Sequence, residues 1–320
     1  MPWQYKYALK LALQKVLGTA PGLYKLQEMF KHLRGNWAAV TEPSFVLSEA
    51  ESRITDFIEA GLRPPRVVVE QGTGWHGTDL VLFALSGATQ VETFDTTRWL
   101  RPELLGSVMK LAPELAPIVA RWPGVALTEA QARADDIARH AAAPLEEQLR
   151  SLRCTQHVTR GPSRPELADA SVDLFYSNSV LQRVAPDPLR SLVSEAQRFL
   201  RHDGQSFHII DTKDFHSITD ARVPQLGYLR WSEAEWRLAT SRYLNYQSRL
   251  RSPAFTRIFE ACFKQTRIVS LLVEPENLDY ARRNHGEDPR FADMSLEELA
   301  ATQTKLVSEG PLQPDLRQAG

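Results

Sequence analysis

Short apolar runs alternate with amphipathic stretches over most of this chain. Runs rich in β-branched or aromatic residues predict strands, and apolar residues at helical spacing predict helices between them. This alternation is typical of an α/β fold with a mostly parallel sheet. The strands are expected at 67–69, 90–94, 154–158, 172–176, 206–210, 265–273 and 304–308, and the helices at 44–60, 78–85, 187–200, 252–263 and 295–302.

The segments outside this alternation divide the chain further. We expect an N-terminal helical extension over 1–43, and a main domain over 44–310 that carries a helical pair inserted at about 100–153. Aromatic and arginine residues concentrated at about 215–252 predict a substrate cap, and 311–320 reads as a loose tail. Within the main domain, Ser48 and Glu51 have the spacing of a capping box for the helix that Gly61 ends.

Residues 1–34 predict two helices that are strongly basic, with six lysines or arginines against Glu28 alone. Two interpretations stay open. The helices cover the domain or a second copy of the chain in a homo-oligomer, with their lysines in water. Alternatively, they contact a membrane surface or a partner, since Trp3, Tyr5 and Tyr7 suit a headgroup layer.

Composition narrows the class of protein. The chain has 320 residues, of which 43% are hydrophobic and 24% charged, as in an ordinary globular protein, and its net charge of −1 gives no support to a nucleic-acid partner. Cys154 and Cys262 form neither a disulfide framework nor a CxxC metal motif, which fits a reducing cytoplasm. We find no apolar run long enough to span a bilayer and no signal peptide, so we expect a cytoplasmic protein.

A glycine-rich loop follows the first predicted strand directly. Gly72, Gly74 and Gly77 allow a tight turn and a close approach of the backbone to a ligand, ahead of a helix N-terminus. Such a loop also occurs where glycines serve only packing. Glu70 precedes it, and Asp95 ends the next strand 18 residues beyond Gly77, near the offset at which an acid binds ribose hydroxyls, although Asp95 before Thr96 also suits a helix N-cap.

Polar residues also follow the fourth and fifth predicted strands. Asn178 and Ser179 leave the fourth at the sheet edge where α/β folds place ligands. The fifth ends in the densest polar cluster of the chain, formed by His208, Asp211, Lys213, Asp214 and His216. Three roles stay open for this cluster: a base or orienting group, a purely structural turn, or ligands to a divalent metal.

Four motifs together resemble those of class I S-adenosylmethionine-dependent methyltransferases, over about residues 44 to 310. The stretch 208–216 and the cap at 228–236 are similar to a bacterial subset that methylates sugars or glycans. The motifs are Glu70-Gln71-Gly72-Thr73-Gly74, Asp95, the stretch Ser171-Val172-Asp173-Leu174-Phe175-Tyr176-Ser177-Asn178-Ser179-Val180-Leu181, and Leu200-Arg201-His202-Asp203-Gly204.

The resemblance implies a Rossmann-like, seven-stranded sheet whose last strand is antiparallel, with S-adenosylmethionine across the C-terminal ends of the first, second and fourth strands. Cofactor contacts are expected from Glu70, Gly72, Thr73, Gly74, Trp75, Asp95, Thr96, Asn178 and Ser179. The family often has an acid after the third strand that contacts adenine. Residues 157–165 contain none, which leaves Glu166 or Asp169 for that role.

The expected reaction is transfer of a methyl group to a hydroxyl of a small molecule or glycan. Methyl transfer needs alignment and exclusion of water, and an alcohol acceptor also needs a base, for which His208, Asp211, Asp214 and His216 are the candidates. No resident metal is expected. An NAD(P)-dependent oxidoreductase and a non-catalytic binding or scaffold protein of the same fold remain as rival interpretations.

Overall fold

The computed structural model describes residues 40–159, 161–218, 220–239 and 246–312. Its centre is a seven-stranded sheet in the order β3-β2-β1-β4-β5-β7-β6. Six strands run parallel, and β7 is antiparallel to both β5 and β6. This confirms the expected Rossmann-like α/β class. The strands are β1 Val67–Gln71, β2 Gln90–Asp95, β3 Cys154–Val158, β4 Val172–Asn178, β5 Leu200–Asp211, β6 Phe263–Leu272 and β7 Gln303–Pro311.

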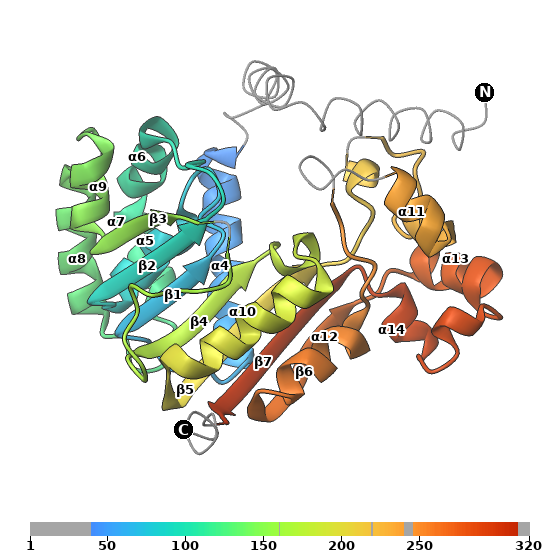
Figure 1. Ribbon diagram of the computed structural model, residues 1–320. Helices are drawn as coiled ribbons and strands as arrows, with labels where there is room; N and C mark the ends of the chain where they lie inside the picture. The colour runs from blue at the N-terminus through green and yellow to red at the C-terminus, as the bar shows by residue number, and fades with distance from the viewer. Residues whose placement is uncertain (1–39, 160, 219, 240–245, 313–320) are drawn as a thin grey trace, which may run out of the picture.

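Helices cover both faces of the sheet, which is why its central strands are apolar on both sides (Figure 1). On one face pack α4 (Pro43–Glu59), α5 (Thr78–Ser86) and α7 (Ala112–Val119), around a core that contains Phe57 and Tyr176. On the other face pack α10 (Pro186–Phe199) and α12 (Ser252–Glu260), around Phe175 and Phe199. Alternate residues of β4 thus enter opposite cores.

Between β2 and β3 the chain forms four short helices rather than the expected helical pair: α6 (Pro102–Lys110), α7, α8 (Leu127–Arg139) and α9 (Leu145–Ser151). They pack tightly. Gly106 lets α6 approach, because a Cβ there would lie 2.2 Å from the Ala141 carbonyl oxygen. The Trp122 indole donates to the Leu62 carbonyl at 2.7 Å and ties this group of helices to the end of α4.

A third core lies beside the far end of the sheet, under α11 (Glu233–Ala239), α13 (Pro275–His285) and α14 (Leu296–Ala300) (Figure 1). Buried Arg251 links this part to the sheet. Its guanidinium donates to the carbonyl of Thr212, to the hydroxyl of Tyr228 and to two carbonyls before β7. The segment expected to be a substrate cap thus supplies core residues as well.

Three local expectations need correction. Helix α4 begins at Pro43, so Ser48 lies in its interior and forms no capping box. Ser295 and Glu298 form a capping box at α14. Strand β5 begins at Leu200 rather than at the expected residue 206, and its pairing with β4 is irregular between Leu200 and Gln205. Helix α13 (Pro275–His285) was not predicted, because its few apolar residues are spread among charged ones.

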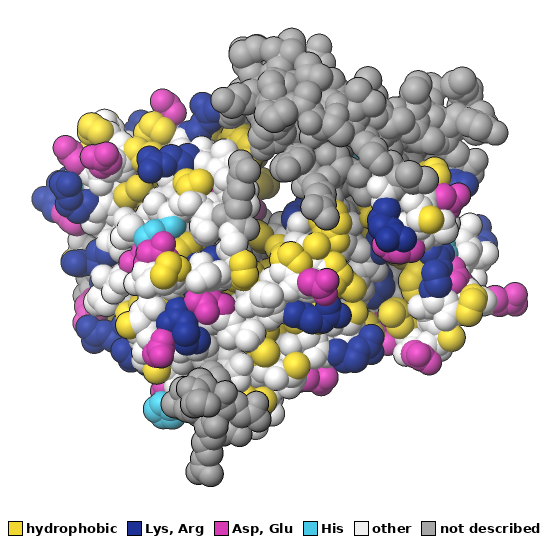
Figure 2. Space-filling model, viewed as in Figure 1, with side chains coloured by type: hydrophobic (Ala, Val, Ile, Leu, Met, Phe, Trp, Pro, Cys, Tyr) yellow, Lys and Arg dark blue, Asp and Glu magenta, His cyan; other side chains and the backbone are white. Residues whose placement is uncertain are grey.

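The surface carries both signs of charge. On the face shown in Figure 2, lysine and arginine side chains are interspersed with aspartate and glutamate. No helix among the described residues is long and apolar enough to cross a membrane. The prediction of membrane, partner or dimer contact by 1–34 lies outside the described residues.

Candidate functional site

The glycine loop lies at the C-terminal end of β1, and its first two glycines are required for different reasons. Gly72 has φ +92°, and a Cβ there would lie 2.3 Å from Cγ2 of Val180. Gly74 has φ +68°, yet its Cβ position has no described atom within 4 Å. Packing against the β4 exit therefore explains Gly72. Gly74 instead faces open space, as expected where a ligand approaches the backbone.

Glu70 lies beneath this loop with its carboxyl group inside the protein. It is 3% exposed. The Thr93 hydroxyl donates to Glu70 Oε2 at 2.7 Å, and the Thr73 and Thr93 hydroxyl oxygens lie 2.6 Å apart. Burial, and secondarily the charge of Asp79, raise the pKa of Glu70 to about 8. Glu70 is therefore largely protonated at neutral pH, and it holds the loop through a chain of hydroxyl groups.

Asp79, in the first turn of α5, is the acid whose charge acts most strongly on Glu70, and it was not predicted. It accepts hydrogen bonds from Arg53 Nε at 3.1 Å and from the Tyr176 hydroxyl at 2.8 Å. Arg53 also pairs with Asp56 at 3.6 Å. An acid in the first turn of a helix is a recognisable sequence signal, but its pairing with α4 and β4 depends on the tertiary fold. Through Asp79, this network connects the start of α5, directly after the glycine loop, to α4 and β4.

Asp95 ends β2 beside the loop, as the sequence predicts. Its carboxylate accepts hydrogen bonds from the backbone N–H groups of Thr96, Thr97 and Gly74. Burial raises the pKa of Asp95, and these N–H groups oppose that rise because they stabilise the charged form. Asp95 thus connects the end of β2 directly to the open position at Gly74.

Two further predicted cofactor residues flank this position. Thr96 is exposed at the end of β2. Trp75 packs on Trp99, with ring centroids 4.4 Å apart, and its carbonyl accepts from the backbone of Arg101. The structure therefore brings Trp75 and Thr96 to the loop region, where their predicted role in cofactor binding stays a prediction.

Arg164 is a buried residue that the sequence does not single out. It is 2% exposed, lies 4.5 Å from the centroid of the Phe94 ring and donates to Gln71 Oε1 at 2.6 Å. It comes from the irregular segment between β3 and β4, which has no periodic pattern. Of the two acids offered for adenine, Asp169 pairs with Arg198, whereas Glu166 is exposed and close enough for its charge to act on Arg164.

At the exit of β4 the backbone makes a sharp change of direction. Asn178 is the last residue of the strand, and Ser179 has φ +56°, an unusual conformation for a residue other than glycine. The Ser179 N–H donates to the Ile209 carbonyl at 2.8 Å, and its hydroxyl donates to Asn178 Oδ1 at 3.2 Å. Both predicted residues therefore lie at the C-terminal edge next to Val180 and Gly72.

His208 is part of the core beneath the sheet edge. It is fully buried between Phe175 and Phe259, and its Nδ1 and Nε2 lie 2.7 Å from the hydroxyls of Ser177 and Ser206. Burial lowers its pKa to about 3. Both ring nitrogens are occupied and the ring is neutral, so this geometry does not suit the predicted catalytic base.

The other three predicted catalytic residues follow β5. Asp211 keeps a partly exposed carboxylate, 3.2 Å from Lys213 Nζ. Asp214 and His216 are 1% and 3% exposed, and Asp214 Oδ1 accepts from the His216 backbone N–H at 2.9 Å. The side-chain amide of Gln247 donates to the Lys213 carbonyl and accepts from the Phe215 N–H. The predicted cluster is thus a tightly bonded turn from which Asp211 projects.

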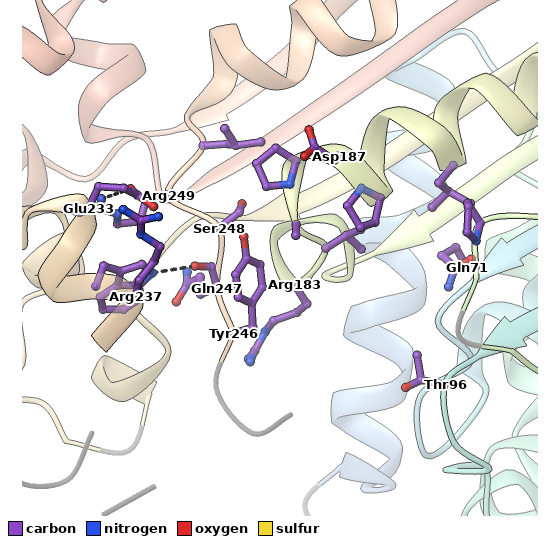
Figure 3. A pocket seen from close by; sticks show the side chains of 18 of the residues that line it. Gln71, Thr96, Arg183, Asp187, Glu233, Arg237, Tyr246, Gln247, Ser248 and Arg249 are labelled. Atoms are coloured by element: carbon purple, nitrogen blue, oxygen red, sulfur yellow. Dashed lines mark hydrogen bonds and ion pairs between the residues drawn. The ribbon is translucent and has the colours of Figure 1, made fainter. Parts of the chain in front are cut away.

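A cavity of about 1210 Å³ opens beside the sheet edge. Figure 3 shows Gln71 and Thr96 at its sheet end and Arg237, Tyr246, Gln247 and Arg249 at its opposite end. Pockets for one drug-sized ligand measure roughly 300–1,000 Å³, so this one has room for two bound groups. Trp236, Arg237, Tyr246 and Arg249 from the predicted cap line this cavity, whereas Tyr228 is a core residue. The role of this segment as a substrate cap stays a prediction.

The arrangement fits a nucleoside cofactor with a cationic end. Gly74 leaves space at the backbone, Asp95 supplies a carboxylate beside it, and carboxyl groups of Glu70 and Asp79 lie below the loop. In the described ranges, no group of three or more His, Cys, Asp or Glu side chains is placed to hold a metal ion.

Comparison with known proteins adds little beyond the fold. No family model and no curated protein matches the chain. One similar solved structure is a candidate O-methyltransferase from Nostoc punctiforme, with 12% identity and a TM-score of 0.41. The match covers 85% of this chain but only 59% of that protein. Another is geranyl diphosphate C-methyltransferase from Streptomyces coelicolor A3(2), with 13% identity and a TM-score of 0.40, and that match covers 82% of this chain and 80% of the other.

A third similar structure is the complex of the Haloferax volcanii Trm112 methyltransferase activator with a methyltransferase candidate. The match has 13% identity and a TM-score of 0.43, and it covers 89% of this chain and 97% of the matched chain. Similarities this low do not establish a family for this protein.

Proposed function

We propose that this protein is an S-adenosylmethionine-dependent methyltransferase that acts on a hydroxyl-bearing small molecule or glycan. The observation that carries the proposal is the Asp95 carboxylate, held by backbone N–H groups that include that of Gly74, where the loop leaves open space. An acid fixed in this position suits the ribose hydroxyls of a nucleoside.

The strand order favours this proposal over a nicotinamide-dependent oxidoreductase. The dinucleotide-binding fold has the order 3-2-1-4-5-6. Here the last strand, β7, is antiparallel, as the resemblance to class I methyltransferases implies, and it lies between β5 and β6. The loop also begins after Glu70, whose carboxyl group lies under the position where a cationic amino-acid end of the cofactor would sit.

When bound, S-adenosylmethionine supplies an electrophilic methyl group on a positively charged sulfur. The chain's own contribution is alignment: Asp95 and Thr96 would hold the ribose end, and Gly72 to Trp75 would follow the amino-acid end. Asn178 and Ser179 would separate the cofactor from the acceptor. Positioning and exclusion of water account for much of the acceleration available to such a transfer.

For an alcohol acceptor, Asp211 is the proposed base or orienting group. Of the four predicted candidates it is the one whose carboxylate is both partly exposed and placed at the end of β5. His208 is assigned to the core, and Asp214 and His216 to the turn. Lys213 Nζ forms an ion pair with the Asp211 carboxylate at 3.2 Å.

Calorimetric titration of the purified chain tests the cofactor assignment. We expect S-adenosylmethionine and S-adenosylhomocysteine to bind, NAD not to bind, and Asp95→Ala to lower the affinity for S-adenosylmethionine at least tenfold. Tight NAD binding without a response to S-adenosylmethionine would contradict the proposal. If Asp95→Ala no longer binds the cofactor but still supports the cellular function, the interpretation as a non-catalytic scaffold protein is favoured.

A methyl-transfer assay over hydroxyl-bearing acceptors tests the substrate class. Asp211→Asn should lower kcat for an alcohol acceptor while leaving S-adenosylmethionine affinity unchanged, because the proposed base acts only on the acceptor. Transfer restricted to amines or carboxylates would refute the role given to Asp211.

A further inference from the structure

The cavity beside the sheet edge is lined by an excess of basic side chains. Among its described lining residues there are five arginines, and only Asp187 and Glu233 carry a negative charge. A cavity lined mainly by one sign of charge attracts ligands of the opposite sign. The arginines are Arg164, Arg183, Arg237, Arg249 and Arg290.

Some of these arginines are already committed to protein partners. Arg249 pairs with Glu233, and Arg290 forms a bidentate pair with Asp288. Arg164 donates to Gln71 and to two loop carbonyls. Their positive charges serve the structure of the cavity wall.

Arg183 differs from them. It lies in the short 3-10 helix Leu181–Arg183 after β4, and its guanidinium has no hydrogen bond or ion pair with any residue in the described part of the chain. Its contact is with an aromatic ring: Cζ lies 4.2 Å from the centroid of Phe215. Burial lowers the pKa of Arg183, and the nearby charge of Asp211 opposes that effect.

An arginine in this state has unused donor capacity. A contact with an aromatic face does not use the N–H groups for hydrogen bonds to oxygen. Arg183 is half-buried, so its charge has lost part of its contact with water. The five N–H donors of a guanidinium match two oxygens of a carboxylate or phosphate. An anion bound in the cavity would therefore supply the missing partner.

We propose that Arg183 recognises an oxyanion, a carboxylate or phosphate, on the methyl acceptor, so that the substrate is an acidic molecule. This inference rests on the proposed function and specifies its substrate class. Phe215 orients the guanidinium, and Tyr246 and Gln247 form the neighbouring cavity wall (Figure 3).

The position of Arg183 assigns it to the acceptor rather than to the cofactor. The cofactor residues proposed above lie at the ends of β1 and β2, apart from Asn178 and Ser179 at the β4 exit, which would separate the cofactor from the acceptor. Gln71 and Thr96, at the ends of β1 and β2, form one end of the cavity. Arg183 instead contacts Phe215, which follows β5, the strand that also carries Asp211. The anion would thus lie on the same side as the group proposed to act on the acceptor hydroxyl.

Titrations on the full chain test this assignment with three probes: inorganic phosphate, benzoate and the neutral analogue benzamide. The variant Arg183→Met keeps a long apolar stem on Phe215 but removes the charge. Its matched control is Arg139→Met, at an exposed position of α8 whose side chain pairs with Asp136. Each titration is run with and without S-adenosylhomocysteine.

We expect the wild-type chain and Arg139→Met to bind phosphate or benzoate but not benzamide, and Arg183→Met to bind the anion at least tenfold more weakly. The preferred probe identifies the anionic group. S-adenosylhomocysteine affinity should be equal in all three proteins. If Arg183→Met does not fold, Arg183→Lys replaces it; that variant should weaken benzoate binding more than phosphate binding, because an ammonium lacks the planar fork.

Three results would overturn the inference: equal anion affinity in the wild-type chain and the folded Arg183 variant, absence of anion binding by the wild-type chain, or a lower affinity of the variant for S-adenosylhomocysteine. The last result would assign Arg183 to the carboxylate of the cofactor. If the proposed function is wrong, the pattern differs, because the wild-type chain then does not bind S-adenosylhomocysteine. The anion titrations run without S-adenosylhomocysteine still test Arg183 in that case.

Discussion

The buried carboxyl of Glu70 makes the stability of this protein depend on pH in an unusual direction. Its pKa is about 8 in the folded chain, against a normal value of 4.5. The folded state therefore holds the proton more tightly than the unfolded state does. The stability contributed by this group is fully present below about pH 4.5 and is lost as the pH rises through 8.

The size of this effect follows from the two pKa values. Within the window, each pH unit changes the free energy of unfolding by about 1.36 kcal/mol. Between pH 5 and pH 8 the wild-type chain should lose about 3 kcal/mol relative to Glu70→Gln, which has no ionisable group at this position. The glutamine also keeps an oxygen that accepts from Thr93, so the variant should fold.

Urea unfolding followed by circular dichroism at several pH values measures the difference. Subtracting the variant from the wild-type chain removes the titration of groups that both share. Glu114→Gln, at an exposed position of α7, is the matched control for the change of residue type. The free energy of unfolding of the wild-type chain, minus that of Glu70→Gln, should fall from pH 5 to pH 8. If this difference stays constant or rises, Glu70 is not a protonated carboxyl group.

Four other substitutions separate ligand contacts from structural ones. Gly74→Ala and Gly61→Ala should each lower the free energy of unfolding by about 1–2 kcal/mol, measured with urea, because both glycines have φ near +70°. In calorimetry only Gly74→Ala should weaken S-adenosylmethionine binding, by at least tenfold. His208→Ala should cost about 3 kcal/mol in urea unfolding, and the wild-type pH–rate profile between pH 5 and 8 should contain no inflection from His208, whose pKa is about 3. Arg164→Met should speed limited proteolysis of the segment 161–170, because it removes the hydrogen bonds that hold this segment to Gln71 and its own carbonyls.

The sequence predicts the layout of this fold well where the signal is local. The third strand is found at its expected limits, Cys154–Val158, and the acids Glu70 and Asp95 end up beside the glycine loop. These predictions rest on apolar periodicity and on the rule that parallel strands bring their C-terminal ends to one edge. Such features survive folding because each depends on a few neighbouring residues.

The site residues that sequence reasoning missed depend on distant partners. His208 looks like a catalytic candidate because polar residues follow it, yet Ser177 of the adjacent strand and two phenylalanines make it part of the core. Arg164 comes from an irregular segment, and only the fold places it on Phe94. Among the described residues, the lack of a hydrogen-bond partner for the Arg183 guanidinium is a property of the packed cavity, which no sequence pattern predicts.

The proposed site has opposite charges at its two ends, and this has a chemical consequence. The Asp95 carboxylate lies beside the loop at the cofactor end, whereas Arg183 lies toward the acceptor side. A methyl donor with a positive sulfur and an acceptor with an anionic group would each meet the complementary charge. A misplaced acceptor would bring its anion toward the Asp95 carboxylate, which is unfavourable. On this reasoning the arginine sets which end of the acceptor faces the methyl group, so its removal should relax regioselectivity as well as affinity.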